Sequence, residues 1–148
     1  MSMAIGENEL VTTREYDVPR ELVFRAWTTP ELLARWWGPK GFTNTFHECD
    51  IRPGGTWILT MHGPDGTDYP NRSVFVEVVA PERVVLDHLS GHEFRLTGTF
   101  EDLDGRTKVT FRQRFKVKEE FEAAKPYCAE ANEQNLDRLG EVLAELAG

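Results

Sequence analysis

Turn signals recur at short, regular intervals through the middle of this 148-residue sequence. They are Gly54-Gly55, Pro64-Asp65-Gly66, Ala80-Pro81-Glu82, Ser90-Gly91 and Asp104-Gly105. The runs between them are rich in β-branched and aromatic residues and predict strands at about 43–51, 56–62, 72–80, 83–90, 92–102 and 106–117. Short strands joined by tight turns are typical of an antiparallel meander.

The last of these runs indicates which side chains face the core. Val109, Phe111, Gln113, Phe115 and Val117 alternate with Thr110, Arg112, Arg114 and Lys116. Successive side chains of a strand point to opposite faces, so this alternation predicts one buried face and one face in water. Residues 92–102 have the same pattern, with Phe94, Leu96, Gly98 and Phe100 together on one face.

Helical patterns flank the meander on both sides. A strand at about 10–18 is followed by two short helices, which begin near Pro19 and Pro30, with Thr29 placed to cap the second. The last segment, 127–147, has leucines three and four residues apart, which predicts a long amphipathic helix. We expect 118–125 to form a separate short turn of helix, because Pro126 interrupts helical hydrogen bonding.

These elements predict a single α+β domain spanning residues 1–148, with its core at about 10–147. A sheet with one apolar face must cover that face, and the last helix is the only predicted element long enough to do so. A strongly bent sheet around one helix seldom fills completely, so we expect a cavity between them.

The composition limits the partners. Acidic residues outnumber basic ones by 25 to 17, for a formal net charge of −8. Nucleic acids and anionic membrane surfaces require a basic face, so we expect neither as a partner. We also expect no membrane span, no secretory signal in the first ten residues and a cytoplasmic location. Cys49 and Cys128 are then expected to be free thiols.

Four stretches resemble the motifs of a known family. They are 19–27, like its first helix; 29–39, with Trp36-Trp37-Gly38-Pro39; 50–57, with Arg52-Pro53-Gly54-Gly55; and 136–139, like its last helix. The chain thus resembles the Aha-type family, related to the activator of the heat-shock-protein ATPase, within the START-like (SRPBCC) superfamily. The resemblance implies a helix-grip fold, with a curved antiparallel sheet wrapped around a C-terminal helix. Members often form dimers, so a homodimer is compatible with it.

The side chains predicted to face the cavity form the candidate ligand site. They are Trp37, Phe46, Trp57, Leu59, Met61, His88, Phe94, Phe111, Gln113, Tyr127, Asn132 and Asn135. Plain core packing is the alternative for most of the aromatic residues. Gln113 is the most informative, because a buried amide needs hydrogen-bond partners. Either another side chain supplies them or a ligand or water does, and the sequence leaves both possibilities open.

The sequence offers little for metal or covalent chemistry. His88 and His92 are four residues apart, but that spacing binds a metal only on a helix, and Ser90-Gly91 predicts a turn. No cysteine or histidine spacing matches a zinc site, so we expect no metal and no cofactor. There is no Gly-x-Ser-x-Gly nucleophile motif either.

Binding of a small, largely apolar molecule such as a lipid is the function that the resemblance implies. A cyclase- or hydrolase-type enzyme using the same cavity is the alternative, and the sequence leaves open whether the protein is an enzyme. That alternative requires a cavity-facing acid or base, such as His88, Glu48 or a Cys128–histidine pair. Activation of a chaperone ATPase is a lesser alternative, since a chain of this length has no room for the co-chaperone's further N-terminal domain.

Overall fold

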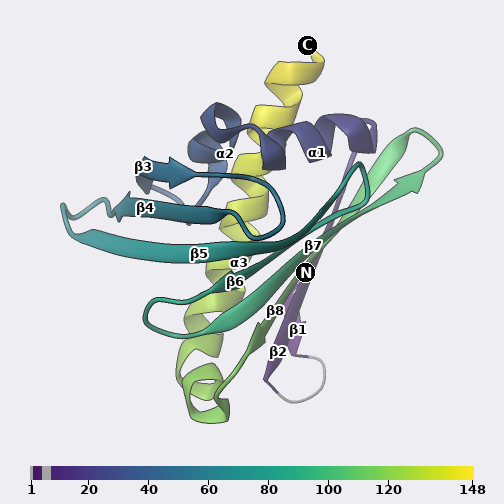
Figure 1. The fold of residues 1–148 in the computed structure, drawn as a ribbon. Coiled ribbons are helices and arrows are strands. Elements are labelled where there is room, and N and C mark those ends of the chain that lie inside the picture. The colour runs from purple at the N-terminus through teal and green to yellow at the C-terminus, as the bar shows by residue number, and fades with distance from the viewer. Residues whose placement is uncertain (1, 5–7) are drawn as a thin grey trace.

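One curved sheet and one long helix dominate the computed structural model, which describes residues 2–4 and 8–148 (Figure 1). The strands are β1 (Ser2–Ala4), β2 (Glu9–Tyr16), β3 (Thr43–Cys49), β4 (Thr56–His62), β5 (Asp68–Val79), β6 (Arg83–His88), β7 (Phe94–Leu103) and β8 (Arg106–Phe115). The helices are α1 (Arg20–Thr28), α2 (Pro30–Trp36) and α3 (Lys118–Ala147). Residues 1 and 5–7, part of the stretch in which we expect no secretory signal, lie outside the described residues.

Within the described residues the strands form one eight-stranded antiparallel sheet, in the order β1-β2-β8-β7-β6-β5-β4-β3. The predicted meander is confirmed, because each strand from β3 to β8 pairs with the next one along the chain. β2 pairs with β8, which brings the two ends of the strand region together. The edge strand β1 is an addition to the prediction. Its three residues are too few to show a period-two pattern.

The sheet curves around α3, while α1 and α2 lie at one end of the molecule (Figure 1). Irregular register at Phe46/Glu48 in β3 and at Phe75/Glu77 in β5 assists the curvature, since a bulge bends its strand. β5 begins at Asp68 rather than near residue 72, so its hairpin with β4 is longer than predicted. Pro70 weakens the strand signal there, although it lies within β5.

The core lies between the inner face of the sheet and α3. Leu96, Phe100 and Val109 of the sheet are at most 1% exposed, as are Leu136 and Leu139 of the helix. The predicted alternation of β7 and β8 and the predicted apolar face of the last helix are therefore confirmed, except at Val117, which lies beyond the end of β8 and is 40% exposed. The chain has the predicted α+β helix-grip fold.

The helix α3 is continuous, so the predicted break at Pro126 is wrong. Pro126 lacks the N–H that would bond the carbonyl of Glu122. Both residues are exposed, so water can take the place of the missing donor. Phe121, which is 4% exposed, packs against Phe115 and fixes the first turns of the helix to the sheet.

The start of α2 differs from the prediction in one detail. Thr29 occupies the position before α2, as expected, but its side chain makes no capping hydrogen bond. Its backbone carbonyl instead accepts hydrogen bonds from the amides of Leu32 and Leu33. Pro30 at the first helical position confirms the predicted beginning of this helix.

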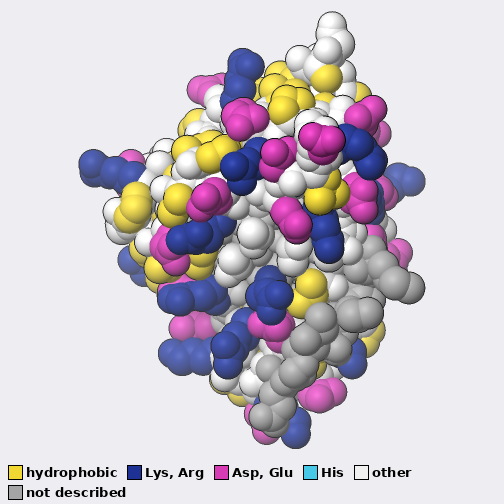
Figure 2. Space-filling model, turned by 90° about the vertical axis from the view of Figure 1, so that its right-hand side faces the viewer, with side chains coloured by type: hydrophobic (Ala, Val, Ile, Leu, Met, Phe, Trp, Pro, Cys, Tyr) yellow, Lys and Arg dark blue, Asp and Glu magenta, His cyan; other side chains and the backbone are white. Residues whose placement is uncertain are grey.

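Charged side chains of both signs are interspersed over the face shown in Figure 2. Many charged side chains of the described residues form ion pairs, such as Arg106 with Glu15 at 3.2 Å and Arg83 with Glu77 at 2.9 Å. Exposed pairs of this kind contribute about 0–1 kcal/mol each, so they matter little for stability. No helix in the described part of the chain is both long and apolar enough to cross a membrane.

Candidate functional site

A cavity of about 480 Å³ lies between α3 and the inner face of the sheet. Its wall comes from the connection that follows α2, from strands β4 to β8, and from the middle of α3. Apolar side chains form most of the wall. Among the described residues that line it, none is an aspartate, glutamate, lysine or arginine.

Most of the residues predicted from the sequence lie around this cavity. They are Trp37, Met61, His88, Phe94, Phe111, Gln113, Tyr127, Asn132 and Asn135. They come from six different elements or connections, which only the fold brings together. Tyr127 lies at the rim, where its side chain is largely in solvent (62% exposed).

The three other predicted residues, Phe46, Trp57 and Leu59, do not line the cavity. Trp57 and Leu59 are each 1% exposed and belong to the solid part of the core. The ring of Trp57 is enclosed by three others, with centroids 4.9 Å from Trp37, 5.4 Å from Phe46 and 5.8 Å from Phe75. Trp37 therefore separates this aromatic cluster from the open volume.

Sequence reasoning missed several lining residues. They are Gly38, Pro39, Phe42, Tyr69, Asn71, His92, Leu96, Cys128 and Ala131. Helical spacing indicates two of them, because Cys128 and Ala131 lie on the same face of α3 as Asn132 and Asn135. Tyr69 lies in the part of β5 that the strand prediction omitted, so no signal places it on the wall.

Gln113 of β8 finds its partner on the facing helix. Asn132 Nδ2 donates a hydrogen bond to Gln113 Oε1 at 3.1 Å, and the two residues are 7% and 5% exposed. The next residue, Glu133, turns away and pairs with Arg14 at 2.9 Å. The sequence left open whether another side chain or a ligand or water pairs with Gln113. In the structure another side chain, that of Asn132, supplies one of its hydrogen bonds.

Asn135 and Arg138 of α3 hold the turn that follows α2. Asn135 Oδ1 accepts a hydrogen bond from Gly38 N at 2.9 Å, and its Nδ2 donates to Trp36 O at 3.3 Å. The Arg138 guanidinium donates to the carbonyls of Arg35, Trp37, Gly38 and Pro39, which lie at the C-terminal end of α2. A cation is favourable there, because carbonyls at a helix C-terminus lack helical partners.

Gly38 is required in this turn for two reasons. Its φ of +97° lies in the left-handed region that favours glycine. A Cβ atom at this position would also lie 2.8 Å from Met61 Cε and 3.3 Å from Phe42 Cβ. The glycine therefore lets the turn approach the side chains that line the cavity mouth.

His88 is the most enclosed titratable group on the wall. Its Nδ1 lies 2.8 Å from the carbonyl of His92, and its Nε2 lies 2.6 Å from the side-chain amide of Asn71. The ring stacks on Phe94 with centroids 4.5 Å apart. Burial lowers the pKa of His88 more than the hydrogen bond to His92 raises it.

The turn held by Asn135 and Arg138 is the Trp-Trp-Gly-Pro stretch that carries the family resemblance. Residues 17–144 match the sequence profile of the family described as activator of Hsp90 ATPase homolog 1-like protein. The chain belongs to this family. No curated protein sequence matches the chain.

Solved structures resemble this AHSA1-like chain along almost its whole length. A protein from Arthrobacter aurescens is 26% identical with a TM-score of 0.86, covering 94% of this chain and 87% of that one. A protein from Nitrosomonas europaea is 25% identical with a TM-score of 0.86, covering 97% and 99%. The AHSA1 protein of Silicibacter pomeroyi has the same fold at 22% identity, with a TM-score of 0.75 and coverage of 94% and 97%.

Of the groups that the enzyme alternative names, His88 and Cys128 line the cavity of this AHSA1-like chain. Burial raises the pKa of the Cys128 thiol, against the opposing effect of a hydrogen bond with Gln113, so the reactive thiolate is scarce near neutral pH. Burial likewise raises the pKa of Cys49 to about 11, and its neighbour His47 bonds Thr60 instead. Glu48 is exposed and lies off the cavity. Within the described residues, no group of three or more His, Cys, Asp or Glu side chains is arranged to hold a metal ion.

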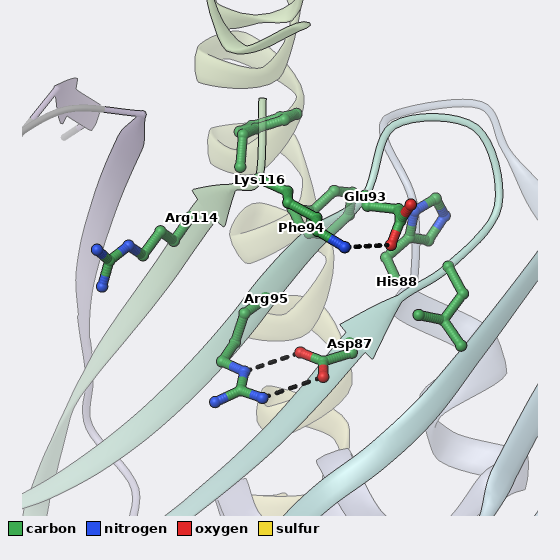
Figure 3. Close-up of a pocket in the computed structure, with 9 residues that line it drawn as sticks. Asp87, His88, Glu93, Phe94, Arg95, Arg114 and Lys116 are labelled. Atoms are coloured by element: carbon green, nitrogen blue, oxygen red, sulfur yellow. Dashed lines mark hydrogen bonds and ion pairs between the residues drawn. The ribbon is translucent and has the colours of Figure 1, made fainter. Parts of the chain in front are cut away.

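A second hollow of about 450 Å³ lies at the ends of β6, β7 and β8, and His88 and Phe94 line both hollows (Figure 3). Its charges are largely paired with one another. Arg95 forms a two-pronged ion pair with Asp87 at 2.8 and 3.0 Å, and Lys116 lies 3.6 Å from Glu93. These pairs leave the Arg114 guanidinium as the unmatched charge among the described residues that line this hollow.

Proposed function

We propose that this chain binds a small, largely apolar molecule in the cavity between the sheet and α3. The observation that carries the proposal is the cavity itself, which has a volume of about 480 Å³ and an uncharged wall rich in aromatic side chains. Cavities that hold small ligands in proteins have volumes of roughly 300–1,000 Å³ and mostly apolar walls with a few polar groups.

The physical driving force would be removal of the ligand's apolar surface from water. Trp37, Phe94 and Phe111 supply flat, rigid surfaces, and Met61 supplies a flexible side chain that can adapt to the shape of the ligand. The few polar groups orient the ligand rather than hold it by charge.

A cavity-filling variant tests the proposal. Ala131 lines the cavity, whereas Ala144 lies on the exposed side of the same helix, so Ala131→Phe and Ala144→Phe form a matched pair. We expect the neutral dye N-phenyl-1-naphthylamine to bind the wild-type protein and the Ala144→Phe variant with enhanced fluorescence. Binding to Ala131→Phe should be at least roughly tenfold weaker, because the added ring occupies the cavity.

Two results would refute the proposal. One is dye binding to Ala131→Phe that equals the binding to Ala144→Phe, since the dye would then sit elsewhere. The other is the lack of any fluorescence response in the wild-type protein. Native mass spectrometry of the purified protein provides an independent check, because a retained small molecule would identify the ligand class.

A further inference from the structure

The amide pair of Gln113 and Asn132 is a buried polar feature of the cavity wall, with the two residues 5% and 7% exposed. Asn132 Nδ2 donates to Gln113 Oε1, and this is one hydrogen bond between two groups of larger capacity. Each primary amide carries two N–H donors and an oxygen that accepts. The bond therefore leaves two N–H donors on the Gln113 nitrogen, one N–H donor on the Asn132 nitrogen and an acceptor on the Asn132 oxygen.

The protein does not use up this capacity. Gln113 also hydrogen-bonds the Cys128 thiol, which is a weak partner and occupies at most one of the two Gln113 hydrogens. No side-chain hydrogen bond within the described residues involves the side-chain oxygen of Asn132, Oδ1. Asn132 Oδ1 is not among the fully buried side-chain atoms that lack a partner, so it keeps some solvent access, and both residues line the cavity.

The same set of free donors and acceptors results if both side-chain amides are flipped, so that the oxygen and nitrogen of each amide exchange places. Gln113 then donates to Asn132, and the atoms left over are the Gln113 oxygen and the Asn132 nitrogen. In either arrangement the wall presents at least one N–H donor beside one acceptor.

We propose that Gln113 and Asn132 select a ligand that carries an uncharged amide-type group, a carboxamide or a lactam, on an otherwise apolar body. This inference rests on the proposed function, because it names the polar group of the molecule that the cavity would hold. The carbonyl of such a group accepts from the free N–H of the wall. Its own N–H donates to the free oxygen, so both buried wall atoms are paired.

Related polar groups fit less well. A carboxylate and an ester contain only acceptors, so either one leaves the free oxygen of the wall unpaired, which is costly in a buried site. A carboxylate would also enter without a counter-charge, because no lysine or arginine is among the described lining residues. The imidazole of His88 is already engaged by His92 and Asn71.

A matched ligand series tests the inference. Decanamide, decanoate and methyl decanoate share one chain length and differ in the polar group, and each would be titrated against bound N-phenyl-1-naphthylamine. We expect decanamide to displace the dye with roughly tenfold higher affinity than the other two, as one or two extra net hydrogen bonds predict. Equal affinities would overturn the inference and leave the proposed function standing, whereas no binding of the dye or of any compound would overturn both.

A double variant shows whether the two amides cause the preference. Gln113→Leu with Asn132→Leu removes both partners together, so no buried amide is left unpaired. We expect dye binding to persist and the preference for decanamide to disappear. Gln134→Leu removes a side-chain amide of the same helix that does not line the cavity, so this variant should keep the preference. If the double variant still prefers decanamide, the inference is wrong, and if it does not fold, the ranking of the three ligands by the wild-type protein decides alone.

Discussion

At the scale of single residues, Gly98 shows how one position can limit the packing of a whole core. It lies on the inner face of β7, directly beneath the ring of Trp27. A Cβ atom at Gly98 would lie 2.6 Å from Trp27 Cη2 and 2.9 Å from Cζ3. Trp27 is 2% exposed and has little room to move, because its ring packs against the rings of Trp36 and Phe100, with centroids 5.0 and 5.3 Å away.

Gly98→Ala should therefore destabilise the protein by about 1–3 kcal/mol, the usual cost of overfilling a packed core. Urea unfolding would measure the change. The same substitution in a Trp27→Phe background should cost less, because the smaller ring makes room for the methyl group. Equal costs in the two backgrounds would show that the contact with Trp27 is not the cause.

His88 gives a prediction about pH at the same scale. Burial holds its pKa below the ordinary value of 6.5, so the unfolded chain binds a proton more readily than the folded one. The contribution of the neutral ring to the free energy of unfolding is fully present above pH 6.5. It is lost as the pH falls through the lowered pKa of the folded state.

We expect His88→Gln to flatten this part of the pH profile. The free energy of unfolding of the wild-type protein should fall more steeply between pH 7 and pH 5 than that of the variant. Urea unfolding at several pH values would measure both profiles. Parallel profiles would contradict the assignment of this slope to His88.

At the scale of elements, the junction between α2 and α3 depends on Arg138. Its guanidinium donates to four backbone carbonyls around the end of α2, and Asn135 bonds the same turn one helical turn earlier. The planar fork of arginine suits several acceptors at once, whereas lysine concentrates its charge at one point. The contacts of Arg138 thus fix the turn that forms part of the cavity wall.

Arg138→Ala should cost about 2–3 kcal/mol of unfolding free energy, since hydrogen bonds from a charged group contribute about 1.5–3 kcal/mol. Arg138→Lys should recover part of the loss. Arg35→Ala is the matched control, because Arg35 forms an exposed ion pair with Glu145 that is worth about 0–1 kcal/mol. Equal losses in Arg138→Ala and Arg35→Ala, measured by urea unfolding, would show that the bonds to the turn add nothing.

At the scale of the whole molecule, stability is distributed unevenly across the sheet. β8 is paired on both sides and places Val109, Phe111 and Phe115 in the core, each at most 3% exposed. β3 is an edge strand whose side chains are exposed or only half-buried, and its pairing with β4 shifts between Phe46 and Glu48. Segments with few buried contacts open locally before the molecule unfolds.

Hydrogen exchange should reveal this difference directly. We expect the amides of β8 and of the Leu136–Leu143 stretch of α3 to exchange only through global unfolding. The amides of β3 should exchange much faster, through local opening. Equal protection of β3 and β8 in a native-state exchange experiment would contradict this ranking.

The sequence predicted some features of the fold and of the site better than others. The meander and the amphipathic helix follow from local patterns, because strand alternation and helical spacing are written in neighbouring residues. Local patterns predict a helix break at Pro126 that does not occur, and they do not predict β1. Local rules do not show that an exposed proline can remain in a helix packed at Phe121, or that three residues can pair with β2.

The sequence by itself determined which side chains are apolar, where the chain turns, and which faces of β7, β8 and the last helix are buried. Only the tertiary structure decided which buried residues meet open volume. Trp57 and Leu59 share a strand face with Met61, yet Met61 lines the cavity and the other two lie in solid core. The reason is that the cavity is the space that remains where elements distant in the sequence pack together. The position of the cavity therefore depends on how the fold brings Trp37, Gln113 and Asn132 together.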